Sequence, residues 1–291
     1  MRRMATYAVM FLMAAAPAWA QRQVDEVRSL DPDGRVSVSN LAGSVTVIGW
    51  GDARVQITGT LGKNVEDLQI EGDARELSIE VDVPKHADDL DTELVVRVPA
   101  TARVEIETVS ATVSIEEMTG PIDVETISGW VKTSSRPSEL SIETVSGDIT
   151  VAEAARRTDL SSVSGRVSVQ QAMGRLDVET VSGGVRVTGG DLEYASFETV
   201  SGDISYAGAI ADGGEFEFES MSGTISLELP AAVSADFDVS TFSGDIDNDI
   251  GPRPRRTSQY TSEEELSFTA GSGGSDVTIS SFSGSVKIRA R

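Results

Sequence analysis

Carboxylates recur along this chain at nearly constant intervals, and this is the first pattern with a chemical meaning. One column of glutamates consists of Glu107, Glu125, Glu143, Glu179, Glu198 and Glu219. A second column, two residues earlier in each unit, consists of Glu105, Asp123, Asp159, Asp177, Glu217 and Asp238. Hard cations prefer carboxylate oxygens, so one hypothesis is a surface that collects Ca²⁺ or docks a cationic partner. The alternative is a solvated acidic face, and the chain lacks the glycine-rich nonapeptide of calcium-binding repeats.

Other reactive side chains give weaker indications of catalysis. Serine precedes glycine in unit after unit, but a nucleophile needs a nearby base and an orienting group, which a side chain repeated in every unit does not have. The single histidine, His86, lies in a polar segment, where we expect a surface residue rather than a general base. We therefore expect no catalytic residue and no cofactor other than Ca²⁺. The alternative is a carbohydrate-active β-helix enzyme, a polysaccharide lyase or hydrolase, with two or three carboxylates in unlike environments of a cleft.

Two departures from the regular pattern are further candidates for binding. The segment 247–274 contains the cationic stretch Gly251–Arg256 and three consecutive glutamates at 263–265. We interpret it as a degenerate coil with a loop, and a binding loop for an anionic partner is the alternative. Trp130 replaces the small or charged residue that follows Ser-Gly in other units, and it could stack on a sugar.

A short repeat with the consensus Ile/Val-Glu-Thr-Val-Ser-Gly must position these residues. Its serines are Ser110, Ser128, Ser146, Ser164, Ser182, Ser201, Ser222, Ser243 and Ser283, at intervals of 18, 18, 18, 18, 19, 21, 21 and 40 residues. Apolar residues stand six and four positions before each serine, an alternation typical of a half-buried strand, and a second apolar column begins three positions after it. Two short strands therefore flank each Ser-Gly.

The segment between the two strands indicates a corner. It contains Thr or Ser, then an apolar residue such as Val145 or Phe242, then Ser-Gly, and the alternation slips by one residue here. We expect glycine to supply a backbone conformation that other residues avoid. The residues expected to form the structural turn are Ser128, Gly129, Ser146, Gly147, Ser164, Gly165, Ser182, Gly183, Ser201 and Gly202.

One such unit cannot fold alone. About five inward apolar side chains contribute roughly 1.5–3 kcal/mol each, whereas ordering the unit costs about 1.5 kcal/mol per residue. Stacking completes the core, because each coil then covers its neighbours. The sequence thus predicts an all-β fold, a parallel β-solenoid (a single-stranded β-helix, expected to be right-handed) with coils of about 18–21 residues stacked about 4.8 Å apart. An array of antiparallel hairpins turning at Ser-Gly is the alternative.

Both ends of the chain differ from the repeats. Residues 1–20 contain two arginines, an apolar stretch and Ala18-Trp19-Ala20, which together are typical of a secretory signal peptide. Residues 21–100 form a less regular N-terminal β region that we expect to cap the solenoid repeats of 101–291, which carry an irregular insert near 247–274. At the C-terminus, Val286–Arg291 alternates outward cations, which we expect to protect the last exposed edge.

Charge and composition limit the partners. The net charge of −23 becomes −25 once the signal is removed, because the signal contains two arginines and no acid. Such a chain repels nucleic acid and anionic membranes, and zero cysteines exclude disulfides and thiolate metal sites. We expect an exported protein, periplasmic, secreted or on the cell surface, with no transmembrane anchor in the mature chain. Its partner would be an envelope or surface protein or polysaccharide.

The segment Val36–Trp50, with Asn40-Leu41-Ala42-Gly43, and the serial Thr-Val-Ser-Gly-Asp-Ile units after it resemble a bacterial repeat family. That family is catalogued as a domain of unknown function and labelled "putative adhesin", and the resemblance covers about residues 30–290. The chain departs from the pattern at Ala111, which replaces the turn glycine, and only Asp148, Asp203 and Asp245 keep the aspartate. The resemblance implies an envelope-associated β-helical protein with an adhesin-like binding or scaffold role, and it supplies no catalytic residues.

Overall fold

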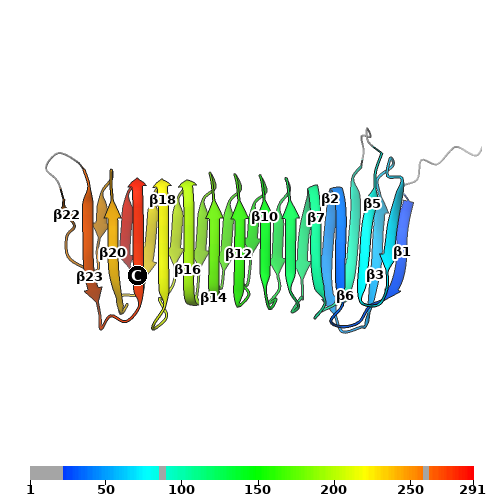
Figure 1. The fold of residues 1–291 in the computed structure, drawn as a ribbon, viewed down its shortest axis with the longest axis horizontal. Coiled ribbons are helices and arrows are strands. Elements are labelled where there is room, and N and C mark those ends of the chain that lie inside the picture. The colour runs from blue at the N-terminus through cyan, green and yellow to red at the C-terminus, as the bar shows by residue number, and fades with distance from the viewer. Residues whose placement is uncertain (1–21, 85–89, 258–261) are drawn as a thin grey trace, which may run out of the picture.

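The computed structural model describes residues 22–84, 90–257 and 262–291, which form a long rod of β-strands lying across its axis (Figure 1). The signal segment and His86 lie outside the described residues. Consecutive strands in the repeats alternate between two rows, and each row pairs in parallel from coil to coil. The chain is therefore a parallel β-solenoid, and the alternative of antiparallel hairpins turning at Ser-Gly is wrong.

The strands follow one another in space in a fixed order along each row. The first row is β4 (Asp67–Gly72), β5 (Glu76–Asp82), β2 (Arg35–Trp50), β7 (Arg103–Glu116), β8 (Ile122–Thr126), β10 (Leu140–Thr144), β12 (Arg157–Ser162), β14 (Met173–Thr180), β16 (Asp191–Ser201), β18 (Glu215–Ser222), β24 (Asp276–Ser283), β20 (Ala235–Thr241), β23 (Glu264–Ala270) and β22 (Arg255–Arg256). The second row is β1 (Arg22–Ser29), β3 (Arg54–Leu61), β6 (Thr92–Pro99), the second halves of β2 and β7, β9 (Val131–Ser134), β11 (Ile149–Val151), β13 (Val167–Gln170), β15 (Val185–Thr188), β17 (Ile204–Ala207), β19 (Ile225–Leu229), β25 (Val286–Ala290) and β21 (Ile246–Asn248).

The repeat keeps one register, so equivalent residues stack in straight columns. Ile142 pairs with Val124 on one side and Leu160 on the other, and Leu160 pairs with Val178 in the next coil. All four side chains are buried in the core. The extra residue of the 19-residue interval is accommodated where the β14–β16 register shifts, so that Glu193 has no partner in β14. Insertions therefore bulge outward and leave the columns in phase.

Larger side chains fill the core where the coils lengthen. Phe197 stacks on Phe218 with ring centroids 5.0 Å apart, and Tyr206 contacts both rings at about 6 Å. Burial raises the pKa of the Tyr206 phenol, so the hydroxyl stays protonated and donates to the carbonyl oxygen of Ala209. These aromatic rings belong to the 19- and 21-residue units and take core positions that mostly Val, Ile or Leu fill in the 18-residue units.

The corner between the strands is closed by side-chain hydrogen bonds. The hydroxyl of Thr144 accepts the N–H of Gly147 at 2.9 Å, and Thr180 accepts the N–H of Gly183 in the same way. The corner serines donate outward to the preceding coil, as Ser146 Oγ does to the carbonyl of Ile127 at 3.2 Å. The hydroxyl of Thr144, Ser162 or Thr180 thus closes the turn in these three coils, and the corner serine ties one coil to the next.

The corner glycines are needed for a different reason from the one expected. Gly147, Gly165 and Gly183 have no left-handed φ; instead, a Cβ on each would lie 1.8 Å from the carbonyl oxygen of the glycine in the preceding coil. Among the described glycines at this corner, Gly43, Gly129 and Gly223 have a positive φ, and the others do not. The expectation of a special backbone conformation is therefore wrong for most coils, because close approach between coils excludes a side chain here.

The C-terminal coil is not at the end of the rod. β25 pairs with β19 on one side and with β21 on the other, and β24 lies likewise between β18 and β20 (Figure 1). The expectation that Val286–Arg291 is the last exposed edge is therefore wrong. Its outward Arg289 bridges two coils through ion pairs with Asp247 and Asp249.

Among the described residues of the segment 247–274, Asp247 and Asn248 belong to the parallel strand β21, and β22 and β23 form an antiparallel cap in place of the expected degenerate coil. β23 pairs antiparallel with β20, and the two-residue β22 continues the first row. Arg256 forms an ion pair with Glu264, whose other oxygen accepts the N–H of Ile246. At the opposite end, the antiparallel strands β4, β3 and β1 close both rows beyond β2, which itself stacks in register on β7. The antiparallel strands at both ends of the rod interrupt the parallel register of the coils, which discourages another molecule from stacking there.

Candidate functional site

The six candidate glutamates lie in one straight column on the outer face of the first row. Glu107 pairs in register with Glu125 and Glu125 with Glu143, and Glu179 pairs with Glu198 and Glu198 with Glu219. Ser161 stands between the two groups of three. We call these six residues the glutamate column. Neighbouring carboxylates are one coil apart, about 4.8 Å.

The second acidic column is partly neutralised by arginines. Arg157 pairs with Asp159 and Arg175 with Asp177, each at 3.0 Å, and Arg35 lies 3.4 Å from Glu105. Within the described ranges, none of the six side chains of the glutamate column has an ion-pair partner. In the second column, Asp123, Glu217 and Asp238 also have no ion-pair partner among the described residues, so both columns carry uncompensated charge, and the glutamate column carries it at every one of its six positions.

An exposed line of apolar side chains runs beside the glutamate column. It consists of Val109, Ile127, Val145, Val163, Val181, Val200, Met221, Phe282 and Phe242, in spatial order, and their exposed fractions are 39–59%. We call these nine residues the apolar ridge. Each lies two residues after the glutamate position of its strand, which is about 6.6 Å away on the same face. An exposed apolar line of this length is typical of a surface that contacts another molecule.

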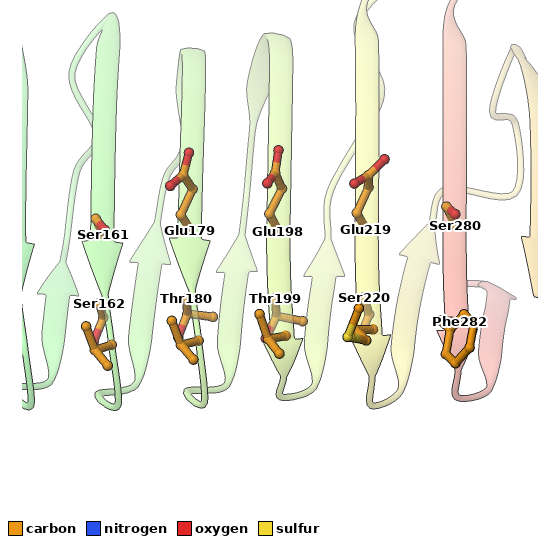
Figure 2. A pocket seen from close by; sticks show the side chains of 14 residues that line it. Ser161, Ser162, Glu179, Thr180, Glu198, Thr199, Glu219, Ser220, Ser280 and Phe282 are labelled. Carbon is orange, nitrogen blue, oxygen red and sulfur yellow. The ribbon is translucent and has the colours of Figure 1, made fainter.

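A groove lies between the glutamate column and the apolar ridge, and buried hydroxyl residues form its floor. Figure 2 shows Glu179, Glu198 and Glu219 side by side, with Thr180, Thr199 and Ser220 next to them and Phe282 at one end. This part has a volume of about 480 Å³. A second part of about 580 Å³ extends past Glu143, Glu125 and Glu107 toward Leu41 of β2, and both parts share Ser161 and Val163. The groove therefore runs continuously along most of the rod.

The central glutamate of each group of three has a raised pKa. Partial desolvation, followed by the negative charges of Asp123, Glu107 and Glu143, raises the pKa of Glu125. Desolvation and the charges of Glu179 and Glu219 raise the pKa of Glu198 in the same way. A nearby cation stabilises the charged form of such a carboxylate. The groove wall is therefore best suited to a positively charged occupant.

A straight line of carboxylates does not by itself enclose a metal ion. Ca²⁺ takes six to eight oxygens at about 2.3–2.6 Å, which must converge from several directions. Among the residues that the structure describes, no group of three or more His, Cys, Asp or Glu side chains could hold a metal ion. The carboxylates of the column thus stand as separate acceptors about one coil apart.

The other sequence candidates lie outside this groove. The corner serines beyond the ridge are engaged with neighbouring coils, and Trp130 is exposed on the corner without lining the groove. Asp148 accepts the N–H of Arg166 and Asp203 that of Thr224, each at 2.8 Å in the next coil. The aspartate of Ser-Gly-Asp-Ile therefore joins coils together. Arg256 of the 247–274 segment is paired with Glu264.

The exposure of the apolar ridge was missed at the level of sequence, although its residues were recognised. The inward alternation continues through Thr180, so Val181 must point outward beside Glu179, and the slip in alternation comes only after it. An apolar residue at an outward position in nine coils is the signal that could have revealed the ridge.

The sequence of residues 31–289 matches the family described as Toastrack DUF4097. The chain belongs to this family. Because the match includes nearly every described strand, the groove lies wholly within the Toastrack region. No curated protein sequence matches the chain, and the described residues include no helix long and apolar enough to cross a membrane.

Solved structures with similar folds share little sequence with this Toastrack chain. A "putative lipid binding protein" from Parabacteroides distasonis ATCC 8503 is 14% identical, with a TM-score of 0.51, and the match covers 92% of this chain and 96% of that one. A "putative adhesin" from the same organism is 14% identical, with a TM-score of 0.47 and coverage of 92% and 97%. Another from Bacteroides fragilis NCTC 9343 is 10% identical, with a TM-score of 0.44 and coverage of 92% and 98%. At 14% identity, the structure with the TM-score of 0.51 supports a shared fold and nothing more.

Proposed function

We propose that this Toastrack protein is a non-enzymatic binding protein of the bacterial envelope that holds a partner along its groove. One observation supports this proposal most directly. The groove is continuous, and it presents the same three kinds of side chain in coil after coil: a carboxylate wall, a hydroxyl floor and an apolar ridge. A rigid surface with one repeated chemistry suits an elongated partner, which gains many equivalent contacts. The signal-like segment at residues 1–20 supports export to the envelope.

The repetition favours binding over catalysis. Acid–base chemistry needs carboxyl groups whose environments move their pKa values apart. Glu125 and Glu198 are shifted in the same direction by the same two causes, desolvation and neighbouring carboxylates. The groove therefore provides two similar acids far apart instead of an unlike pair at one place.

A lipid is a second candidate because one protein of similar fold carries that description and because the apolar ridge is exposed. The glutamate column lies about 6.6 Å from the ridge and would repel anionic headgroups. A lipid occupant would thus need a neutral or cationic headgroup.

Site-specific photo-crosslinking in the native host tests the proposed function. A benzoylphenylalanine placed at Val181 or Val200 faces the groove, whereas one placed at Arg186 on β15 faces outward from the second row. We expect discrete adducts from the two ridge positions and none from Arg186. Equal adducts at all three positions, or none at any, would contradict a binding role for the groove.

A further inference from the structure

We infer that the groove holds an amphipathic α-helix of about twenty residues that carries a stripe of Lys or Arg beside an apolar stripe. The inference rests on the proposed function and names its partner. It depends on two features of the groove: parallel lines of charge and apolar surface, and a change in chemistry at one end.

The spacing of the columns fits a helix better than an extended chain. Residues on one face of a helix recur once per turn, every 5.4 Å or so, which is close to the roughly 4.8 Å between coils. Same-face residues of a strand recur about every 6.6 Å and lose phase with the coils within two steps. Flexible Glu, Lys and Arg side chains can absorb the smaller mismatch. The glutamate column spans about 29 Å from Glu107 to Glu219, the length of roughly five helical turns.

The two stripes correspond to the two walls of the groove. Basic residues spaced three or four positions apart would face the carboxylates, which have no ion-pair partner among the described residues. The adjacent apolar stripe would cover ridge residues such as Val163 and Val181, which are 46% and 47% exposed. Ser161 interrupts the carboxylates, so two clusters of basic residues should be separated by about one turn.

The C-terminal end of the ridge gives the groove a direction. Phe282 and Phe242 stack on each other with centroids 5.0 Å apart and an interplanar angle of 7°, yet they are 56% and 51% exposed. Their strands carry Ser280 and Ser240 at the glutamate position, so the two coils of the aromatic pair have no carboxylate there, and the next one is Glu265 of β23, opposite Ser240. Exposed Met221 adjoins this pair. A bulky apolar end of the helix, beyond its basic residues, packs here and sets the orientation, because aromatic and methionine clusters are common binding anchors.

Fluorescence anisotropy with a designed peptide tests the inference directly. The probe is a labelled helical peptide of about twenty residues with a Lys stripe, an adjacent Leu stripe and a terminal Trp. Comparison peptides are a scrambled version, a β-forming version with alternating Lys and Leu, and a helix with Glu in place of Lys. We expect saturable binding of the helical Lys peptide that weakens as salt rises, and at least about tenfold weaker binding of the other three.

Protein variants locate the contact. E125Q/E198Q should weaken binding about three- to tenfold at low salt, whereas E116Q/E228Q removes the same charge from exposed positions of the second row and should not. M221S/F242S/F282S should weaken binding at least about tenfold. W130S is its control, since Trp130 is 49% exposed and does not line the groove.

The possible outcomes distinguish the identity of the partner from the wider proposal that the groove is a binding site. Equal binding of the scrambled or β-forming peptide, or of polylysine, would overturn the helical partner. So would binding of phosphatidylcholine vesicles without binding of the peptide, which would assign the ridge to lipid. Loss of peptide binding in the control variants would place the contact elsewhere. In all these cases the crosslinks at Val181 and Val200 would still stand, so failure of the helix is distinguishable from failure of the groove as a binding site.

Discussion

Gly183 lies directly against Gly165 of the preceding coil, so close that a Cβ on Gly183 would come within 1.8 Å of the Gly165 carbonyl oxygen. Its sequence neighbour Gly184 has no such constraint, because the nearest atom to a Cβ there is the Asp203 carbonyl oxygen at 3.7 Å. Two adjacent glycines thus have opposite structural roles. One is required by the stacking of coils, and the other is replaceable.

The glycine pair yields the first prediction. G183A should lower the free energy of unfolding by about 1–3 kcal/mol or more, since the coils must separate to admit a methyl group. G184A should stay within about 0.5 kcal/mol of the wild type. Chemical denaturation of both variants measures the difference. Equal stability of the two would contradict the contact between corner glycines.

Thr180 and Thr199 occupy equivalent buried positions in successive coils but differ in their hydrogen bonds. Thr180 Oγ1 accepts the N–H of Gly183 at 2.9 Å, whereas Thr199 Oγ1 has no partner. T180V should therefore lose about 1–3 kcal/mol by leaving a buried N–H unsatisfied, and T180S should recover most of it. T199V should be neutral or slightly stabilising. Thermal melting of the three variants tests this, and a T199V loss as large as that of T180V would refute it.

The coil-to-coil register was predictable from sequence because it is a local property repeated many times. Ile142 and Val178 fall in one apolar column at fixed spacing, and a register error would turn every inward side chain outward. The glutamate column follows from the same register. The outward direction of Val181 was also readable from the alternation, which continues through Thr180 and slips only after Val181.

The order of the coils at the C-terminal end could not be predicted. Every unit offers similar apolar columns to its neighbours, so nothing local tells whether the Ser283 coil stacks on that of Ser243 or of Ser222. The structure places it between them, because the antiparallel strand β23 covers the outer edge of β20 and leaves the other edge of β20 for β24. The contact that requires glycine at the corner was likewise not predictable, because it forms between two coils and does not depend on the backbone conformation of a single unit.

Acidity should stabilise the groove region. The raised pKa values of Glu125 and Glu198 mean that the native state holds their protons to higher pH than the unfolded chain does. Stability therefore falls as pH rises from the ordinary glutamate pKa through the raised one. E125Q/E198Q should melt above the wild type at pH 7 and low salt, and this difference should shrink at pH 4 and in high salt.

Asp236 supplies a control of opposite sign for that measurement. Hydrogen bonds from the Thr269 hydroxyl and from the Gly274 N–H, the latter at 3.2 Å, lower the pKa of Asp236. Its contribution is present above the ordinary aspartate pKa and is lost as pH falls through the lowered value. D236N should thus melt below the wild type at pH 7. Shifts of the same sign in D236N and E125Q/E198Q would contradict the electrostatic account of the groove.

Calcium should not act as a specific ligand of the glutamate column. Its carboxylates form a single line with about one coil between neighbours, so they cannot surround one ion with six or more oxygens. Millimolar CaCl₂ should therefore shift the melting temperature no more than MgCl₂ or NaCl of equal ionic strength, and EDTA should leave it unchanged. A rise that is specific to Ca²⁺ and absent in E125Q/E198Q would instead establish a calcium site.

Deleting residues 275–291 should open the interior of the rod and not trim its end. This deletion removes β24 and β25, which pair with β18 and β19 on one side and with β20 and β21 on the other. The buried side chains Phe218 and Phe237 both face Ile279 or Val277 across these pairs, so both coils lose apolar cover. Hydrogen exchange should show loss of protection across 235–248 and 264–270, while 140–151 in the middle of the rod stays protected. K287A changes only an outward side chain of β25 and should retain the wild-type pattern. Full protection of β20 in the truncated chain would mean that the cap stacks without the C-terminal coil, which would contradict the strand order of this end.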